Sequence, residues 1–161
     1  PGVVTKLESQ QSFYDSAGLT IQIPKLNLNI PVVGVQLKDG TWDVSWLWDQ
    51  AGWLQKTAYP TFPGNSVVTG HVVNADGTPG PFARIRQLQV GDYIFIELNG
   101  YRYTYKVVSN SRVSPNDISI LRHEEKSWLT LVTCDKYDAK TAAYLKRVVV
   151  RTVLIDVDIM I

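Results

Sequence analysis

The chain has 161 residues, the length of one domain, and no internal repeat or linker divides it. Hydrophobic residues make up 45% of it and charged residues 19%, so it can bury a core and lacks the composition of a disordered protein. The formal net charge of +1 gives no strong field toward nucleic acid or an anionic membrane, and no apolar run reaches the roughly 18 residues of a spanning helix.

The first residues differ in composition from the rest of the chain. Residues 1–18 are polar and rich in serine and glutamine, so we expect a loosely docked arm beside a folded domain over residues 19–161. Two segments then alternate apolar and polar side chains with the period of a β-strand, Thr20–Ile23 and Leu26–Ile30, and each stops at a proline. The aromatic stretch Trp42–Trp53 is expected to be a loop that contains a short helix.

The strand pattern continues through the middle of the chain. Ser66–Gly70 is predicted to be a strand that carries His71 at its end. Asp92–Leu98 and Tyr101–Val108 flank Asn99-Gly100, a dipeptide that favours a tight hairpin because both turn positions take a positive φ.

Two further strands and two short helical segments complete the predicted elements. Trp128–Cys134 is a short apolar strand, and Leu145–Val157 is a long one rich in β-branched residues. Pro81–Leu88 can make one or two helical turns, and Ser114–Leu121 is predicted to be a capped short helix or a 3-10 turn. About eight strands in so short a chain indicate an all-β fold, a closed or nearly closed barrel.

The single cysteine, Cys134, excludes an intramolecular disulfide and a cysteine-rich zinc site. A lone cysteine is usually a small buried hydrophobic residue, but this one ends a strand where the chain turns polar, as does His71. Arg147 opens the last strand thirteen residues after the cysteine, close enough for a hairpin-like return to bring it alongside. A thiolate, an imidazole and a guanidinium suit acyl transfer, which needs neither metal nor cofactor.

These residues stand in motifs that resemble those of the sortases, the cysteine transpeptidases that attach proteins to Gram-positive cell walls. The most specific is Thr130–Cys134, and Thr69–His71 and the basic pair Lys146-Arg147 accompany it. The match runs from about Ile21 to Val153. The resemblance implies a closed eight-stranded β-barrel, and the subclass stays open.

The resemblance also implies a reaction. The family's cysteine cleaves a sorting signal similar to Leu-Pro-x-Thr-Gly after its threonine and forms a thioacyl enzyme, which an amine of a cell-wall precursor or pilin subunit then resolves. Carried over, Cys134 is the nucleophile, His71 is first the general acid and then the base, and Arg147 positions the substrate and supports the oxyanion. The substrate-binding residues would be Thr69, Val113, Pro115, Ile118, Val132 and Thr133.

Several alternatives remain at this stage. The apolar residues between 108 and 126 can equally pack a short helix onto the barrel. Asp39, Asp43 and Asp49 are spread out, so we expect no required metal and no other cofactor. A second Cys–His family, the L,D-transpeptidases, is disfavoured because no histidine stands beside Cys134. A catalytically silent barrel that binds peptides or polysaccharide is the alternative from outside the enzymes.

The resemblance extends to partners and location. It implies a sorting-signal peptide on secreted surface proteins, an amine acceptor and no nucleic acid. It also implies residence at the extracytoplasmic face of the cell membrane, through an N-terminal helix that this sequence does not include.

Overall fold

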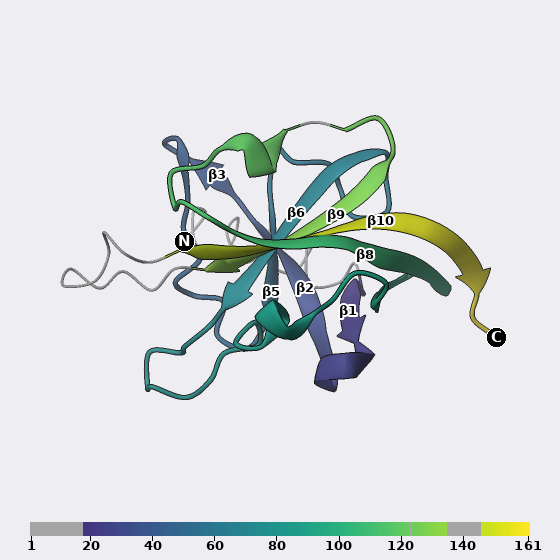
Figure 1. Ribbon diagram of the computed structural model, residues 1–161, viewed down its shortest axis with the longest axis horizontal. Helices are drawn as coiled ribbons and strands as arrows, with labels where there is room; N and C mark the ends of the chain where they lie inside the picture. The colour runs from purple at the N-terminus through teal and green to yellow at the C-terminus, as the bar shows by residue number, and fades with distance from the viewer. Residues whose placement is uncertain (1–17, 123, 135–145) are drawn as a thin grey trace, which may run out of the picture.

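Eight strands close into a barrel in the order β1-β2-β5-β6-β9-β10-β8-β7 in the computed structural model, which describes residues 18–122, 124–134 and 146–161 (Figure 1). The strands are β1 (Thr20–Ile23), β2 (Leu28–Val35), β5 (Ala51–Leu54), β6 (Gly64–His71), β7 (Tyr93–Leu98), β8 (Tyr101–Val113), β9 (Ser127–Cys134) and β10 (Arg147–Ile159). The all-β prediction and the closed eight-stranded barrel are confirmed. The predicted arm lies outside the described residues, apart from Gly18.

Shorter elements decorate the barrel. A two-stranded hairpin, β3 (Leu37–Lys38) and β4 (Thr41–Trp42), stands apart from it. Three single 3-10 turns are η1 (Pro24–Leu26), η2 (Ile85–Gln87) and η3 (Ser119–Leu121). The last two fall inside the two segments for which short helical structure was predicted. Within the described ranges no helix has the length and apolar character needed to cross a bilayer.

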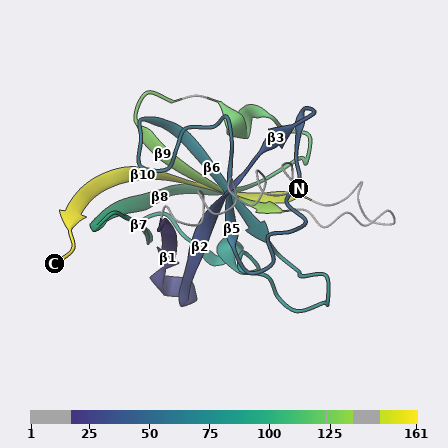
Figure 2. The same ribbon diagram turned by 180° about the vertical axis from the view of Figure 1, so that it is seen from behind.

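Parallel pairing occurs at two places in a sheet that is otherwise antiparallel. β2 pairs with β5, and β6 pairs with β9, in parallel register. β6, β9 and β10 lie side by side in both views of the ribbon (Figures 1 and 2). Since parallel strands end at the same edge, this arrangement carries the C-terminal ends of β6 and β9 to one rim of the barrel.

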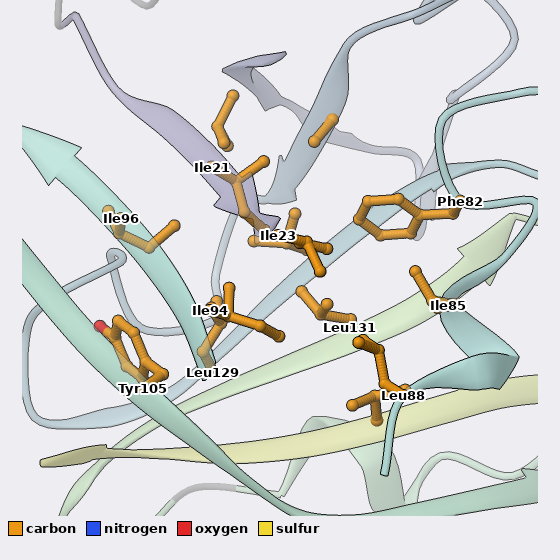
Figure 3. Close-up of a cluster of buried hydrophobic side chains, with 14 of the residues drawn as sticks. Ile21, Ile23, Phe82, Ile85, Leu88, Ile94, Ile96, Tyr105, Leu129 and Leu131 are labelled. Atoms are coloured by element: carbon orange, nitrogen blue, oxygen red, sulfur yellow. The ribbon is translucent and has the colours of Figure 1, made fainter. Parts of the chain in front are cut away.

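The interior of the barrel is filled by side chains from nearly every strand. They come from alternate positions, as the period-two pattern requires, and they include Ile21, Ile23, Ile94, Ile96, Tyr105, Leu129 and Leu131 (Figure 3). Phe82, Ile85 and Leu88, from the segment around η2, enter the same cluster. Each of these side chains is at most 2% exposed, so the barrel is a packed core rather than a channel.

One predicted boundary is wrong, because Pro31 does not end the second strand. β2 continues through it to Val35. The amide of Val32 donates to Leu19 on the β1 side, so the nitrogen of Pro31 faces the opposite edge. At that edge the ladder with β5 begins only at Val32, so the N–H that Pro31 lacks removes no hydrogen bond from the ladder.

The predicted short helix within Trp42–Trp53 is also wrong. The segment is a loop of separate turns, and its last residues form β5. The turns are closed by single hydrogen bonds, from Leu47 N to Val44 O and from Gln50 N to Leu47 O, and Trp48 between them has a φ of +54°. A non-glycine residue in that left-handed region interrupts a right-handed helix.

The hairpin predicted at Asn99-Gly100 is confirmed. The two residues have φ values of +53° and +81°, as this type of tight turn requires, and they join β7 to β8. β8 is longer than predicted, since it continues to Val113 by pairing with β10.

The packing of Phe82 predicts a large stability effect. Phe82→Ala should lower the free energy of unfolding by about 3–5 kcal/mol, because the ring is fully buried and its removal leaves a cavity. Phe62→Ala is the matched control: that ring is 60% exposed, so the loss should stay below about 1 kcal/mol. Urea titration measures both, and equal losses would contradict the assigned core.

Candidate active site

Three of the predicted site residues meet at one rim of the barrel. In the parallel ladder of β6 and β9, Gly70 pairs with Thr133 and His71 pairs with Cys134. On the other side of β9, β10 pairs Val149 with Val132. Continuing that register by two residues sets Arg147 opposite Cys134. The backbone of Cys134 therefore lies between those of His71 and Arg147.

The strands remain close at this rim. The amide of Val148 donates to Thr133 Oγ1 over 2.9 Å, which links β10 to β9 one residue before Cys134. Thr69 Oγ1 donates to the carbonyl of Val132 over 2.8 Å, which links β6 to β9 from the other side. These side-chain hydrogen bonds hold the three strand ends in the register described.

The His71 side chain is half-buried and is held by a loop. Its Nε2 lies 2.9 Å from the carbonyl oxygen of Val44, in the loop between β4 and β5. The backbone carbonyl of His71 accepts from Phe82 N over 2.9 Å as the chain turns back. A Cβ at Gly80 would collide with that same carbonyl, so this turn requires glycine. The imidazole is thus held by the Val44 carbonyl, and the backbone of His71 is held by the turn at Gly80.

A groove of about 300 Å³ lies beside the rim. One wall is the β3–β4 hairpin with Trp42 and Val44, and the other is the segment from Pro115 to Leu121. Its remaining lining comes from β5, β6 and β9, and from Arg147 at the start of β10. Because its lining is mainly apolar and includes one arginine, it suits an extended peptide with apolar residues.

The predicted substrate-binding residues divide into two groups. Thr69, Pro115, Ile118 and Val132 line the groove. Val113 and Thr133 are not among the lining residues. The Thr133 hydroxyl accepts from Val148 N, and Val113 packs against a second hydrophobic cluster, which consists of Val33, Val35, Leu47, Leu54, Val67, Val132 and Val149. Thr133 is only 4% exposed, so little of it is accessible to a ligand.

Two charged residues, Arg147 and Asp117, line the groove. Arg147 lies at the rim, and Asp117 lies on the wall before η3. The hydroxyl and the amide of Ser119 both donate to Asp117 Oδ1, over 2.6 and 2.9 Å, and these hydrogen bonds hold the pKa of Asp117 below its usual range. Asp117 is therefore a carboxylate at neutral pH.

The second arginine of β10, Arg151, is engaged elsewhere. Its guanidinium lies 3.3 Å from Glu124 and 4.4 Å from the centre of the Trp128 ring. Arg147, the arginine expected at the site, lines the groove instead.

Sequence reasoning missed the hairpin wall. β3 and β4 are joined by Asp39-Gly40, with φ values of +53° and +77°. Asp-Gly favours a tight hairpin turn for the same reason as Asn99-Gly100, so the sequence could have predicted this hairpin. The contact from Val44 to His71 had no such signal, because any residue supplies a carbonyl.

Among the described residues, no group of three or more His, Cys, Asp or Glu is arranged to hold a metal.

Comparison with known proteins identifies the family. The family model described as the Sortase domain matches residues 21–155. The chain belongs to the sortase family. Sortase D of Bacillus subtilis is 31% identical over 115 residues, which cover 71% of this chain and 52% of that protein. Sortase A of Staphylococcus aureus is 28% identical over 85 residues, 52% of this chain and 41% of that protein. The chain thus spans about half the length of these relatives.

Solved sortase structures share the fold. Sortase A of Listeria monocytogenes superposes with a TM-score of 0.71, covering 91% of this chain and 92% of that one at 22% identity. Sortase C-3 of Streptococcus pneumoniae gives a TM-score of 0.72 at 23% identity, covering 91% and 66% of the two chains. The barrel seen here is therefore the sortase fold.

The turn behind His71 predicts a local steric effect. Gly80→Ala should lower the free energy of unfolding by about 1–3 kcal/mol, because the added methyl meets backbone that cannot move aside without shifting His71. Ala75→Ser, on the exposed part of the same loop, should change it by less than about 0.5 kcal/mol. Thermal unfolding monitored by circular dichroism measures both. A Gly80→Ala protein as stable as the parent would contradict this packing.

Proposed function

We propose that this sortase is a cysteine transpeptidase acting on a sorting signal similar to Leu-Pro-x-Thr-Gly. It cleaves after the threonine and transfers the acyl group to an amine of a cell-wall precursor or pilin subunit. The observation that supports this most strongly is the register at the rim, where Cys134 stands between His71 and Arg147 beside the groove. Membership of the family supplies the reaction class.

The first half-reaction forms a thioester. The Cys134 thiolate attacks the threonine carbonyl, the oxyanion is stabilised by Arg147, and the His71 imidazolium gives its proton to the departing glycine nitrogen. A free thiol has a pKa of about 8.5 and a free imidazole about 6.5, so at neutral pH the reactive ion pair would be a minor population. A nearby guanidinium raises the share of thiolate by direct charge attraction.

The second half-reaction releases the product. The neutral His71 takes a proton from the incoming amine, which attacks the thioester and expels the Cys134 thiolate. Proton and charge then stand as they did at the start, so the cycle consumes no cofactor. Water in place of the amine would give hydrolysis through the same steps.

The groove fits the proposed peptide. In this proposal the apolar surfaces of Ile118 and Val132 bind the leucine and proline, and Arg147, which also lines the groove, interacts with the scissile carbonyl. Pro115 and Leu121 extend the same wall. A substrate carried on secreted surface proteins would place the enzyme at the extracytoplasmic face of the membrane, held by an N-terminal anchor.

The roles of the three residues predict the effects of their substitution. Cys134→Ala and His71→Ala should lower cleavage of a Leu-Pro-x-Thr-Gly peptide by at least about 1000-fold, since each removes a group that takes part in bond making. Arg147→Lys should lower cleavage by about 10- to 100-fold, because the planar guanidinium, which can donate two parallel hydrogen bonds, is replaced by an ammonium that acts as a point charge. Chromatography of the peptide products, with an added amine, measures cleavage and transfer together.

The experiment has a matched control variant and a result that would favour the non-enzymatic alternative. Arg151→Lys makes the same change on the same strand outside the groove and should alter the rate less than about threefold. No cleavage by the parent protein, with a thiol that an alkylating agent labels no faster than in the unfolded chain, would favour the peptide- or polysaccharide-binding barrel instead.

A further inference from the structure

The contact between His71 and Val44 fixes the hydrogen on one ring nitrogen. His71 Nε2 lies 2.9 Å from Val44 O, and a carbonyl oxygen only accepts hydrogen bonds. Nε2 therefore donates in this arrangement. The other nitrogen, Nδ1, is then the one that is free to gain and lose a proton.

The same peptide group is held from its other edge by a carboxylate. Val44 C=O and Ser45 N–H belong to one planar trans peptide and point in opposite directions. Ser45 N donates to Asp43 Oδ1 over 3.0 Å, and Ser45 Oγ donates to the same oxygen over 2.6 Å. These hydrogen bonds also hold the pKa of Asp43 below its usual range, so it is ionised at neutral pH.

The surrounding loop is anchored in the core. Leu47 is fully buried, and its amide donates to Val44 O over 3.2 Å. Val44 itself packs against the hydrophobic cluster that contains Leu47. Because the loop is anchored at Leu47, the orientation of the Val44–Ser45 peptide plane depends on the acceptor to which the Ser45 N–H donates. A charged acceptor on that N–H also polarises the peptide and strengthens its carbonyl as an acceptor.

We propose that Asp43 is a positioning residue for His71, acting through the Val44–Ser45 peptide. It keeps the hydrogen on Nε2, so that Nδ1 is the ring nitrogen that exchanges protons in the proposed reaction. Resting on the proposed function, this assigns the proton path: Nδ1–H gives its proton to the departing glycine nitrogen and Nδ1 later takes one from the incoming amine. The Nε2 hydrogen stays on the ring throughout.

The test uses two substitutions of Asp43 and a matched control. Asp43→Ala removes the acceptor, whereas Asp43→Asn keeps an oxygen for both Ser45 donors and loses only the charge. Asp76→Ala removes the same turn elsewhere, since Thr78 N and Oγ1 donate to Asp76 Oδ1 over 3.0 and 2.6 Å. Measured quantities are kcat and KM for peptide transfer, and the rate at which the His71 Nε2 hydrogen exchanges with solvent, followed by nitrogen-15 NMR.

Asp43→Ala should lower kcat about tenfold, with KM changed less than about twofold, and speed exchange of the Nε2 hydrogen about tenfold. Asp43→Asn should recover most of both losses, and Asp76→Ala should leave both unchanged. His123→Gln identifies the two histidine signals.

Unchanged exchange in Asp43→Ala would overturn the proposal, even if kcat fell, because Asp43 would then act by another route. Equal losses in Asp76→Ala would overturn it as well. The exchange rate needs no turnover, so a parent protein that does not cleave the peptide would defeat the proposed function and leave the role of Asp43 to be decided on its own.

Discussion

The parallel ladder between β6 and β9 is the constraint on which the site depends. More than fifty residues separate the two strands in the chain, yet their register alone sets His71 beside Cys134. A shift of one residue would bring Thr133 opposite His71 and turn every side chain of one strand to the other face. Buried hydrogen bonds oppose such a shift: Thr130 Oγ1 donates to Asn65 Oδ1 over 2.6 Å at one end of the ladder, and Thr69 donates to β9 near the other.

Asn65 also ties the ladder to the groove. Only 3% exposed, it accepts from Thr130 and donates through Nδ2 to the carbonyl of Ile120 over 2.7 Å, which holds the wall around η3. The opposite wall is fastened by Trp42, whose indole donates to the carbonyl of Gln55 over 2.9 Å. Both walls lie outside the eight barrel strands, and both are tied to the rest of the protein by hydrogen bonds of this kind. The position of the groove relative to the rim therefore follows from the barrel register.

The sequence was most informative where one residue type determines local geometry. Period-two alternation predicted the barrel strands, and Asn99-Gly100 predicted its hairpin because few residues accept a positive φ at both positions. The resemblance identified Cys134, His71 and Arg147, and the structure brings their backbones together. The failures share a different cause. Whether the strand ends at Pro31 depends on which edge of β2 is paired at that residue. The contact of Val44 with His71 uses a backbone carbonyl, which every residue has. Neither feature leaves a pattern along the chain.

Disulfide formation in His71→Cys tests the central claim most directly. Neighbouring strands lie about 4.8 Å apart, within the range of roughly 4.4–6.8 Å between Cα atoms that a disulfide spans. Mild oxidation should therefore join position 71 to Cys134, seen by mass spectrometry as a loss of two hydrogens. Thr69→Cys, paired with Val132 two residues earlier, should not form the bond. A folded His71→Cys protein whose two thiols stay free, or a bond that forms from position 69 instead, would contradict the register.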